Sequence, residues 1–271
     1  MSPEFVWFMA ALVAAGLFAG FIGGLFGVGG GIVLVPALYL IFSALNVDEH
    51  VRMHVAVATS ISTIISTSWR SLSTHAKSGA VDFNVLKTWG PWIALGAVIG
   101  SALASAASTQ SLVIYFGVGL LIAAAQLGFG NPNWRLVADL PRGAARALIA
   151  TILGACSAAM GIGGGTFGVP MMTLMGRPIH QAVATASGFG AAIALPATLG
   201  FVITGWGHPG LPLGSLGFVN TPGFVLLGLL TAITAPLGAR LAHRLDQRLL
   251  RRAFAVFLAL TAFNLLRNAL R

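Results

Sequence analysis

Apolar runs fill most of the chain and are separated by short breaks that contain glycine, proline or charged residues. Most of these runs approach the roughly 20 residues that a helix needs to cross the hydrocarbon core of a bilayer. Two of them, 31–45 and 165–176, are shorter and would extend only about 18–23 Å at 1.5 Å per residue. The segments expected to be helical are 5–26, 31–45, 54–72, 86–106, 111–130, 143–160, 165–176, 182–204, 222–243 and 253–270.

The pattern occurs twice, since stretches of the first half return in the same order in the second half. Each copy contains a glycine run that joins a long apolar segment to a short one, and a proline follows five residues after each run. The sequence therefore predicts an internal repeat of about five segments. The matching pairs are GVGGGIVLVP (27–36) with GIGGGTFGVP (161–170), HVAVATS (54–60) with HQAVATA (180–186), and IGSALAS (99–105) with LGARLAH (237–243).

The composition indicates an integral membrane protein. Hydrophobic residues make up 57% of the chain and charged residues 8%, whereas a soluble domain has about 25% charged residues. The net charge of +9 comes from bases in short loops between apolar runs. It favours anchoring at the cytoplasmic surface over binding of nucleic acid. The single cysteine, Cys156, excludes an internal disulfide.

Residues 5–26 are interpreted as part of the fold and not as a signal peptide. No basic residue precedes them, only Glu4, and the run exceeds the usual apolar core of a signal. The run also has a counterpart in the second half of the chain.

The distribution of charge between loops predicts the topology. If all ten segments cross the membrane, one side receives twelve Lys and Arg residues and the other three. Cytoplasmic loops hold the excess of positive charge, so both termini are expected outside a cytoplasmic (inner) membrane. Repeats of five crossings must be inverted, a common construction in secondary transporters. We expect a first repeat 1–130, a cytoplasmic linker 131–142 and a second repeat 143–271.

The glycine runs are the candidate binding site. The helical hairpins 5–45 and 143–176 are expected to bring their tips near the bilayer midplane, giving an all-α fold of two inverted repeats. Each short segment begins at a tip, where free N–H groups and the helix dipole favour an anion. Close packing of small residues is the alternative reading of these runs. The expected binding residues are the backbone at Gly29, Gly30, Gly31, Ile32, Gly163, Gly164, Gly165 and Thr166, together with the hydroxyl of Thr166.

Polar residues close to these tips are further candidates. The hydroxyls of Thr59, Ser60, Thr185 and Ser187, on the segments with the AVAT motif, are expected to contact an anion, or else to bond their own helices. Four residues at the ends of these segments are candidates for gating or proton coupling, although ordinary interfacial positions also explain them. These four residues are His54, His180, Arg52 and Arg177.

The remaining polar and sulfur-containing residues exclude several functions. All six acids fall in loops or near segment ends, which argues against a carboxylate proton relay or a charged cation site. Cys156 and nearby methionines could ligate a soft metal, but core packing is the preferred interpretation. No nucleotide loop or catalytic arrangement is recognisable, so we expect neither an enzyme nor a bound cofactor.

The quoted motifs give the chain a family resemblance. GFIGGLFGVGGGIVLVPAL, GACSAAMGIGGGTFGVPMM and the two AVAT stretches resemble the sulfite exporter TauE/SafE family of membrane permeases. The resemblance implies export of a sulfur-containing anion such as sulfite, sulfoacetate or another organosulfonate. Family members often have Asn near the start of the AVAT segment, where this chain has His54 and Val55, and His180 and Gln181.

We therefore predict a secondary transporter that binds a small anion between its repeats and works by alternating access in the lipid bilayer. The alternatives are an anion-selective channel of the same architecture, a permease for an unrelated anion or metal, and a scaffold that transports nothing. The sequence leaves the oligomeric state open, and a homodimer is one arrangement that it allows.

Overall fold

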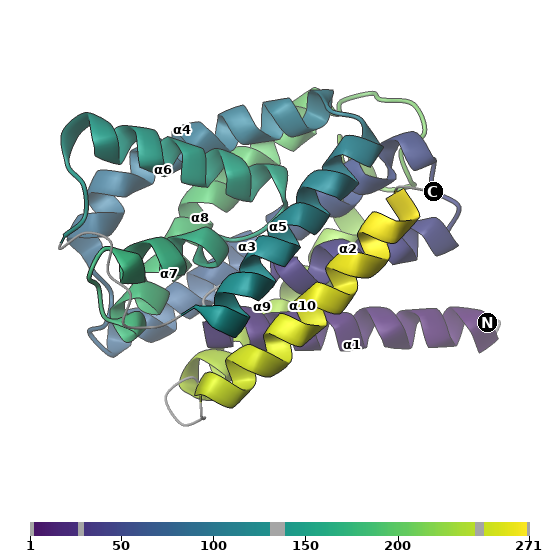
Figure 1. Ribbon diagram of the computed structural model, residues 1–271. Helices are drawn as coiled ribbons and strands as arrows, with labels where there is room; N and C mark the ends of the chain where they lie inside the picture. Colours follow the sequence, from purple (N-terminus) through teal and green to yellow (C-terminus); the bar gives the residue numbers. More distant parts are fainter. Residues whose placement is uncertain (1–2, 27–29, 131–138, 242–246, 270–271) are drawn as a thin grey trace.

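The computed structural model describes residues 3–26, 30–130, 139–241 and 247–269. These ranges fold almost entirely into helices, and the only strands that they contain form a two-residue antiparallel pair (Figure 1). The elements are α1 (Pro3–Phe26), α2 (Gly31–Ala44), α3 (Glu49–Lys77), α4 (Phe83–Ala106), α5 (Thr109–Phe129), α6 (Gly143–Ala159), α7 (Gly165–Leu174), α8 (Ile179–Thr204), β1 (Ser215–Leu216), β2 (Val219–Asn220), α9 (Thr221–Leu241) and α10 (Gln247–Ala269).

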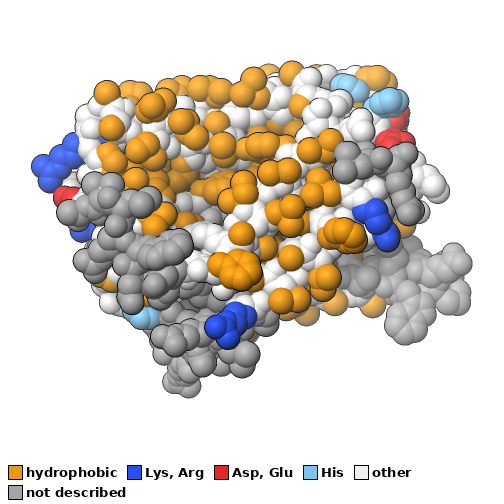
Figure 2. Space-filling view, in the orientation of Figure 1, with side chains coloured by type: hydrophobic (Ala, Val, Ile, Leu, Met, Phe, Trp, Pro, Cys, Tyr) orange, Lys and Arg blue, Asp and Glu red, His pale blue; other side chains and the backbone are white. Residues whose placement is uncertain are grey.

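The helices agree with the predicted segments, and they make this a multi-pass membrane protein. Four helices (α4, α5, α8 and α9) contain windows long and apolar enough to cross a membrane, and α1, α2, α6 and α10 contain shorter apolar stretches. Hydrophobic side chains cover the middle of the face in view, with charged side chains at its margins (Figure 2). The fold is therefore all-α, as expected. Most of the predicted linker, residues 131–138, lies outside the described residues.

Helix α3 differs from its prediction because it is longer and more polar. It runs from Glu49 to Lys77, whereas the apolar pattern indicated 54–72. Asp48 caps it by accepting a hydrogen bond from the His50 N–H at 2.9 Å, which moves the start into the polar loop. Hydroxyl-bearing residues inside the helix are buried against neighbouring helices, so the helix lacks the continuous apolar surface of a lipid-facing span.

Helices of the two halves pack against each other in matching pairs. Helix α1 packs on α9, and α4 packs on α6; α3 packs on α8, and α5 on α10. If α1 to α5 correspond in order to α6 to α10, the pair α1–α9 in one half is equivalent to the pair α6–α4 in the other. The pairs α3–α8 and α5–α10 each join two corresponding helices. This pairing is what a two-fold relation would produce, and it supports the predicted inverted repeat, which stays a prediction.

Two groups of loop residues mark the opposite ends of α3. At its start His54 Nε2 lies 2.9 Å from the Ala107 carbonyl oxygen, and the His54 ring stacks on Phe218. We call this the histidine end. Beyond the last turn of α3, Arg177 pairs with Asp139 at 3.3 Å and with Asp82 at 3.9 Å, and we call this the arginine end.

Helices α3 and α8 are antiparallel, because the loop that follows α8 lies at the histidine end. There the Phe218 N–H donates to the Phe201 carbonyl at 3.2 Å. The strand pair β1–β2 belongs to this loop, and the hydrophobic pattern did not predict it. An antiparallel arrangement of these two matching helices is required if the halves are inverted.

Glycines allow the backbones of the matched pairs to touch. A Cβ on Gly24 of α1 would overlap the Ala235 carbonyl of α9, and a Cβ on Gly96 of α4 would overlap the Thr151 carbonyl of α6. Small residues at helix crossings promote association in membranes, where van der Waals packing replaces the hydrophobic effect. Glycine at the helix crossing thus allows close packing in both the α1–α9 pair and the α4–α6 pair.

We expect Gly96→Ala to lower the free energy of unfolding by about 1–3 kcal/mol, because the new methyl group forces α4 and α6 apart. Thermal unfolding in detergent, followed by tryptophan fluorescence, measures this. The matched control is Gly128→Ala on α5, where a Cβ would meet only the Ala255 methyl carbon at 3.6 Å. An equal loss of stability in both variants would contradict the packing argument.

Candidate functional site

The second glycine run forms a tight turn between α6 and α7. Gly161 has a φ of +66°, which favours glycine. The Ile162 N–H donates to the Ser157 carbonyl at 3.0 Å, and the Gly161 N–H to the Ala158 carbonyl at 3.0 Å. These two bonds are those of a Schellman motif, which satisfies the last carbonyls of α6. The chain can therefore reverse inside the protein before α7 begins at Gly165.

The part of the first glycine run that the structure describes, Gly30 and Gly31, lies at the start of α2. Gly30 has a φ of +80° and is the N-cap residue of α2. Its carbonyl accepts bonds from Val33 and Leu34, and a Cβ here would meet the Ala19 carbonyl oxygen at 2.6 Å. Gly29, another predicted binding residue, lies outside the described residues.

The start of α2 contacts the second turn in the interior of the protein. A Cβ on Gly31 would overlap the carbonyl oxygen of Gly161. The same oxygen accepts a hydrogen bond from Ser60 Oγ of α3 at 2.9 Å. Ser60 is fully buried, so α3 fixes the second turn against the start of α2. Of the predicted hydroxyls, this one contacts a glycine turn by a direct hydrogen bond.

Two buried hydroxyls beside the second turn have no hydrogen-bond partner among the described residues. Thr166, in the first turn of α7, is 7% exposed, and Ser157, in the last turn of α6, is 0% exposed. A buried hydroxyl without a partner costs free energy, so such groups require an explanation. The sequence analysis named Thr166 but missed Ser157, because a serine in a run of small residues is typical of helix packing.

The start of α7 adds favourable electrostatics for an anion at this place. The first-turn N–H groups of a helix have no partner inside that helix, and they form the positive end of its dipole. Gly163, Gly164 and Gly165 are buried there. The absence of a side chain at Gly164 allows α8 to pack closely there, with Phe189 against this glycine. Ile32 takes the place of Thr166 at the start of α2 and is 2% exposed, so that position lacks a comparable hydroxyl.

The paired AVAT threonines make hydrogen bonds within the protein, and their contact with an anion stays a prediction. Thr59 Oγ1 accepts a hydrogen bond from the Asn220 N–H at 2.9 Å, and Thr185 Oγ1 accepts one from the Asp82 N–H at 2.9 Å. Asn220 and Asp82 cap the starts of α9 and α4, because their side chains accept from Gly223 and Val85. The two threonines therefore make equivalent contacts in the two halves, each joining a core helix to a neighbouring cap.

The other predicted site residues lie away from the turns. Ser187 donates to the Ala184 carbonyl of its own helix at 2.6 Å. His54 and Arg177 belong to the two ends of α3 described above, and His180 is exposed at the start of α8. Arg52 donates to the Val47 carbonyl at 2.9 Å and lies over the Tyr39 ring.

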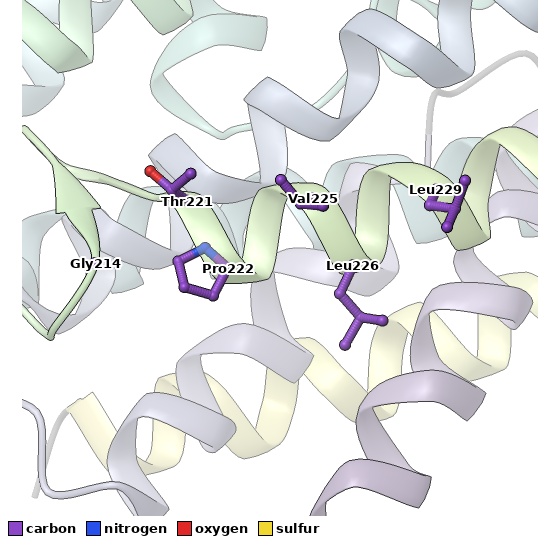
Figure 3. Close-up of a pocket in the computed structure, with 6 residues that line it drawn as sticks. All are labelled: Gly214, Thr221, Pro222, Val225, Leu226 and Leu229. Carbon is purple, nitrogen blue, oxygen red and sulfur yellow. The ribbon is translucent and has the colours of Figure 1, made fainter.

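A groove on the surface of α9 does not match the chemistry of an oxyanion. It has a volume of about 660 Å³, and its lining is almost wholly apolar (Figure 3). In the described ranges, moreover, no three His, Cys, Asp or Glu side chains come together to hold a metal. The buried second turn is therefore the better candidate for a polar ligand. The groove is lined by Gly214, Thr221, Pro222, Val225, Leu226 and Leu229.

Helices that begin or end inside the protein are found in many secondary transporters. Residues 12–265 match the protein family described as sulfite exporter TauE/SafE. The chain belongs to this family, which confirms the resemblance based on its two glycine motifs.

Relatives in other organisms extend over nearly the same length. A probable membrane transporter protein of Haemophilus influenzae is 29% identical over 265 residues, covering 95% of this chain and 98% of the relative. A probable membrane transporter protein of Methanocaldococcus jannaschii is 24% identical, covering 92% and 91%. No solved structure matches the chain. The protein is thus a membrane transporter.

We expect Thr59→Val and Thr185→Val each to lower the free energy of unfolding by about 1–3 kcal/mol, because each leaves a cap N–H without its acceptor. Chemical or thermal unfolding in detergent measures the change. Thr63→Val is the matched control, since Thr63 Oγ1 donates to the Ser60 carbonyl of its own helix. That carbonyl also accepts the backbone bond of the helix. A loss for Thr63→Val as large as for Thr59→Val would contradict this role.

Proposed function

We propose that this transporter exports a small sulfur-containing anion, such as sulfite, sulfoacetate or a related organosulfonate, across the cytoplasmic membrane. Membership of the sulfite exporter family supports the substrate class, and the buried polar turn supports an anion. The observation that argues most strongly for it is the pair of unpartnered hydroxyls, Thr166 and Ser157, next to the start of α7.

The anion would bind at the second glycine turn. Its oxygens would accept hydrogen bonds from the Thr166 and Ser157 hydroxyls and from the first N–H groups of α7. Donors held in place by a rigid turn cost little to organise when the ligand arrives. The binding residues predicted on the first glycine run would then serve mainly to hold α2 against the second turn, because Ile32 offers no side-chain donor.

We assign the arginine end to the cytoplasm and the histidine end to the outside, which also places both termini outside. The excess of Lys and Arg in the loops of the arginine end supports this orientation. An inside-negative potential then drives an anion outward with about 2.3 kcal/mol per charge for each 100 mV. Export needs no second ion, in keeping with the absence of carboxylates from the middle of the predicted segments.

Alternating access would expose the second turn to each side in turn. At the cytoplasmic end, Arg177 joins the loops after α3, α5 and α7 through its ion pairs with Asp82 and Asp139. At the outer end, the stack of His54 on Phe218 closes the start of α3. We propose that these two contacts open and close alternately. The non-enzymatic character of the protein follows from this mechanism.

We expect Thr166→Val and Ser157→Ala to raise the KM for transport about tenfold or more, because a hydrogen bond to a charged group contributes about 1.5–3 kcal/mol. The measurement is flux of radiolabelled sulfite and sulfoacetate into proteoliposomes under an imposed potential. Neither variant should lose stability, since neither hydroxyl has a protein partner to lose.

The matched control is Thr173→Val, which removes a hydroxyl of α7 that donates to the Val169 and Pro170 carbonyls of its own helix. Unchanged KM values in all three variants would contradict the proposal that the anion binds at the second turn. Flux that saturates and is stimulated by substrate on the far side supports a carrier, whereas single-channel conductance steps would support the competing anion channel.

A further inference from the structure

Helices α3 and α8 match in sequence but differ in chemistry at the positions that both bury. Aligning His54 with His180 gives an offset of 126 residues. Buried polar residues on the second half of α3 then correspond to buried apolar residues on the second half of α8. The pairs are Thr63 with Phe189, Thr67 with Ile193, Ser68 with Ala194, Ser71 with Ala197, and His75 with Phe201.

The two sets of residues extend in opposite directions from the second glycine turn. Ser60 of α3 bonds Gly161, and the polar residues continue from there to the arginine end. Phe189 of α8 packs on Gly164, and the apolar residues continue to the histidine end, where the Phe201 carbonyl accepts from Phe218. At the matched positions, one half of the protein therefore has a buried polar row and the other half a buried apolar one. The Thr198 hydroxyl, next to Ala197 on α8, is also buried without a partner among the described residues.

Two of the four hydroxyls of the polar row, those of Thr63 and Thr67, make hydrogen bonds within the protein, whereas the Ser71 hydroxyl is buried without one among the described residues. Thr67 Oγ1 donates to the Thr63 carbonyl and bonds Thr231 Oγ1 of α9 at 2.8 Å. Ser68 faces α8, where a Cβ on Gly190 would overlap its hydroxyl. Ser71 follows Thr67 by four residues and Ser68 by three, so it lies on the face of α3 between α9 and α8.

The Ser71 hydroxyl is 2% exposed and has no hydrogen-bond partner in the part of the chain that the structure describes. A serine packed between helices would normally donate to a carbonyl of its own helix, as Ser62 does to Thr59. A buried donor with no partner among the described residues requires an explanation, and a bound ligand that accepts its hydrogen provides one.

We propose that Ser71 is an anion contact on a hydroxyl-lined route between the second glycine turn and the arginine end, and that the apolar row on α8 seals the opposite half. The ligand class is a small oxyanion, whose oxygens would accept the Ser71 hydrogen. The proposal rests on the proposed function, because it assumes that an anion occupies the second turn. On this route, the anion would move along the face of α3 that lies between α8 and α9 to reach the second turn.

The test is access of a small anionic thiol reagent, sulfonatoethyl methanethiosulfonate, to cysteines placed at the two matched positions. Ser71→Cys and Ala197→Cys are made separately with Cys156→Ser, which removes the native cysteine. Reaction rates are measured in inside-out and right-side-out vesicles. We expect Ser71→Cys to react from the arginine end about tenfold or more faster than Ala197→Cys reacts from either end, since a polar route admits the reagent and an apolar seal excludes it.

A trimethylammonium analogue of the reagent tests the sign of the charge. After correction for intrinsic reactivity, Ser71→Cys should prefer the anionic reagent. Equal rates at the two positions, or reaction of Ser71→Cys only from the histidine end, would overturn the proposal. So would an unreactive Ser71→Cys in a variant shown to be folded by its unfolding temperature.

Flux separates this inference from the function on which it rests. Ser71→Ala should raise the KM for anion presented at the arginine end several-fold, with unchanged stability, and Ala197→Gly should leave the KM as it is. If Thr166→Val impairs flux while Ser71→Cys is inaccessible, the proposed binding turn stands and the route falls. If Ser71→Cys reacts as expected while no sulfur anion is transported, the route stands and the proposed substrate falls.

Discussion

A helix that starts inside a membrane leaves its first N–H groups without partners, and the rest of this structure follows from that constraint. Such groups are tolerated at membrane depth only where protein or a polar ligand surrounds them. Here α7 begins at Gly165, and the turn before it is pinned by Ser60 and abuts Gly31. The long helices α3 and α8 enclose this turn and the start of α2, and the glycine-packed pairs α1–α9 and α4–α6 enclose those helices in turn. Next to this turn, the buried hydroxyls of Ser157 and Thr166 have no hydrogen-bond partner among the described residues.

The helix packing of the two halves is nearly symmetric, whereas the buried side chains of the two halves differ in polarity. Thr59 and Thr185 make the same cap contact in each half, and the helix pairs match as a two-fold relation would require. Against this background, Thr166 stands where the first half has Ile32, and a polar row on α3 stands where α8 is apolar. In the proposed mechanism, a symmetric scaffold would give the two end states similar packing, and an asymmetric lining would give the two halves of the proposed route different affinities for charge. That combination suits a transporter whose direction is set by the membrane potential.

Much of this organisation could be predicted because it depends on local sequence. Apolar run length predicts the helices, and paired glycines with a following proline predict the turns. The finer features depend on contacts across the chain. Whether Thr59 faces a ligand or the N–H of Asn220 is decided by a loop 161 residues away. Ser157 is indistinguishable in sequence from a packing serine, and only its burial without a partner singles it out. The strand pair at 215–220 is held by Phe201 from the end of α8, which no local pattern encodes.

The central claim is that an anion binds at the second glycine turn, and anomalous scattering from a bound analogue tests it most directly. Selenite has the shape and charge of sulfite and a strong anomalous signal. If the anion binds there, a selenium peak is expected within hydrogen-bonding distance of the Thr166 and Ser157 hydroxyls, in front of the first turn of α7. A peak beside Gly30 and Ile32 alone, or selenium bound only at the surface arginines, would contradict it.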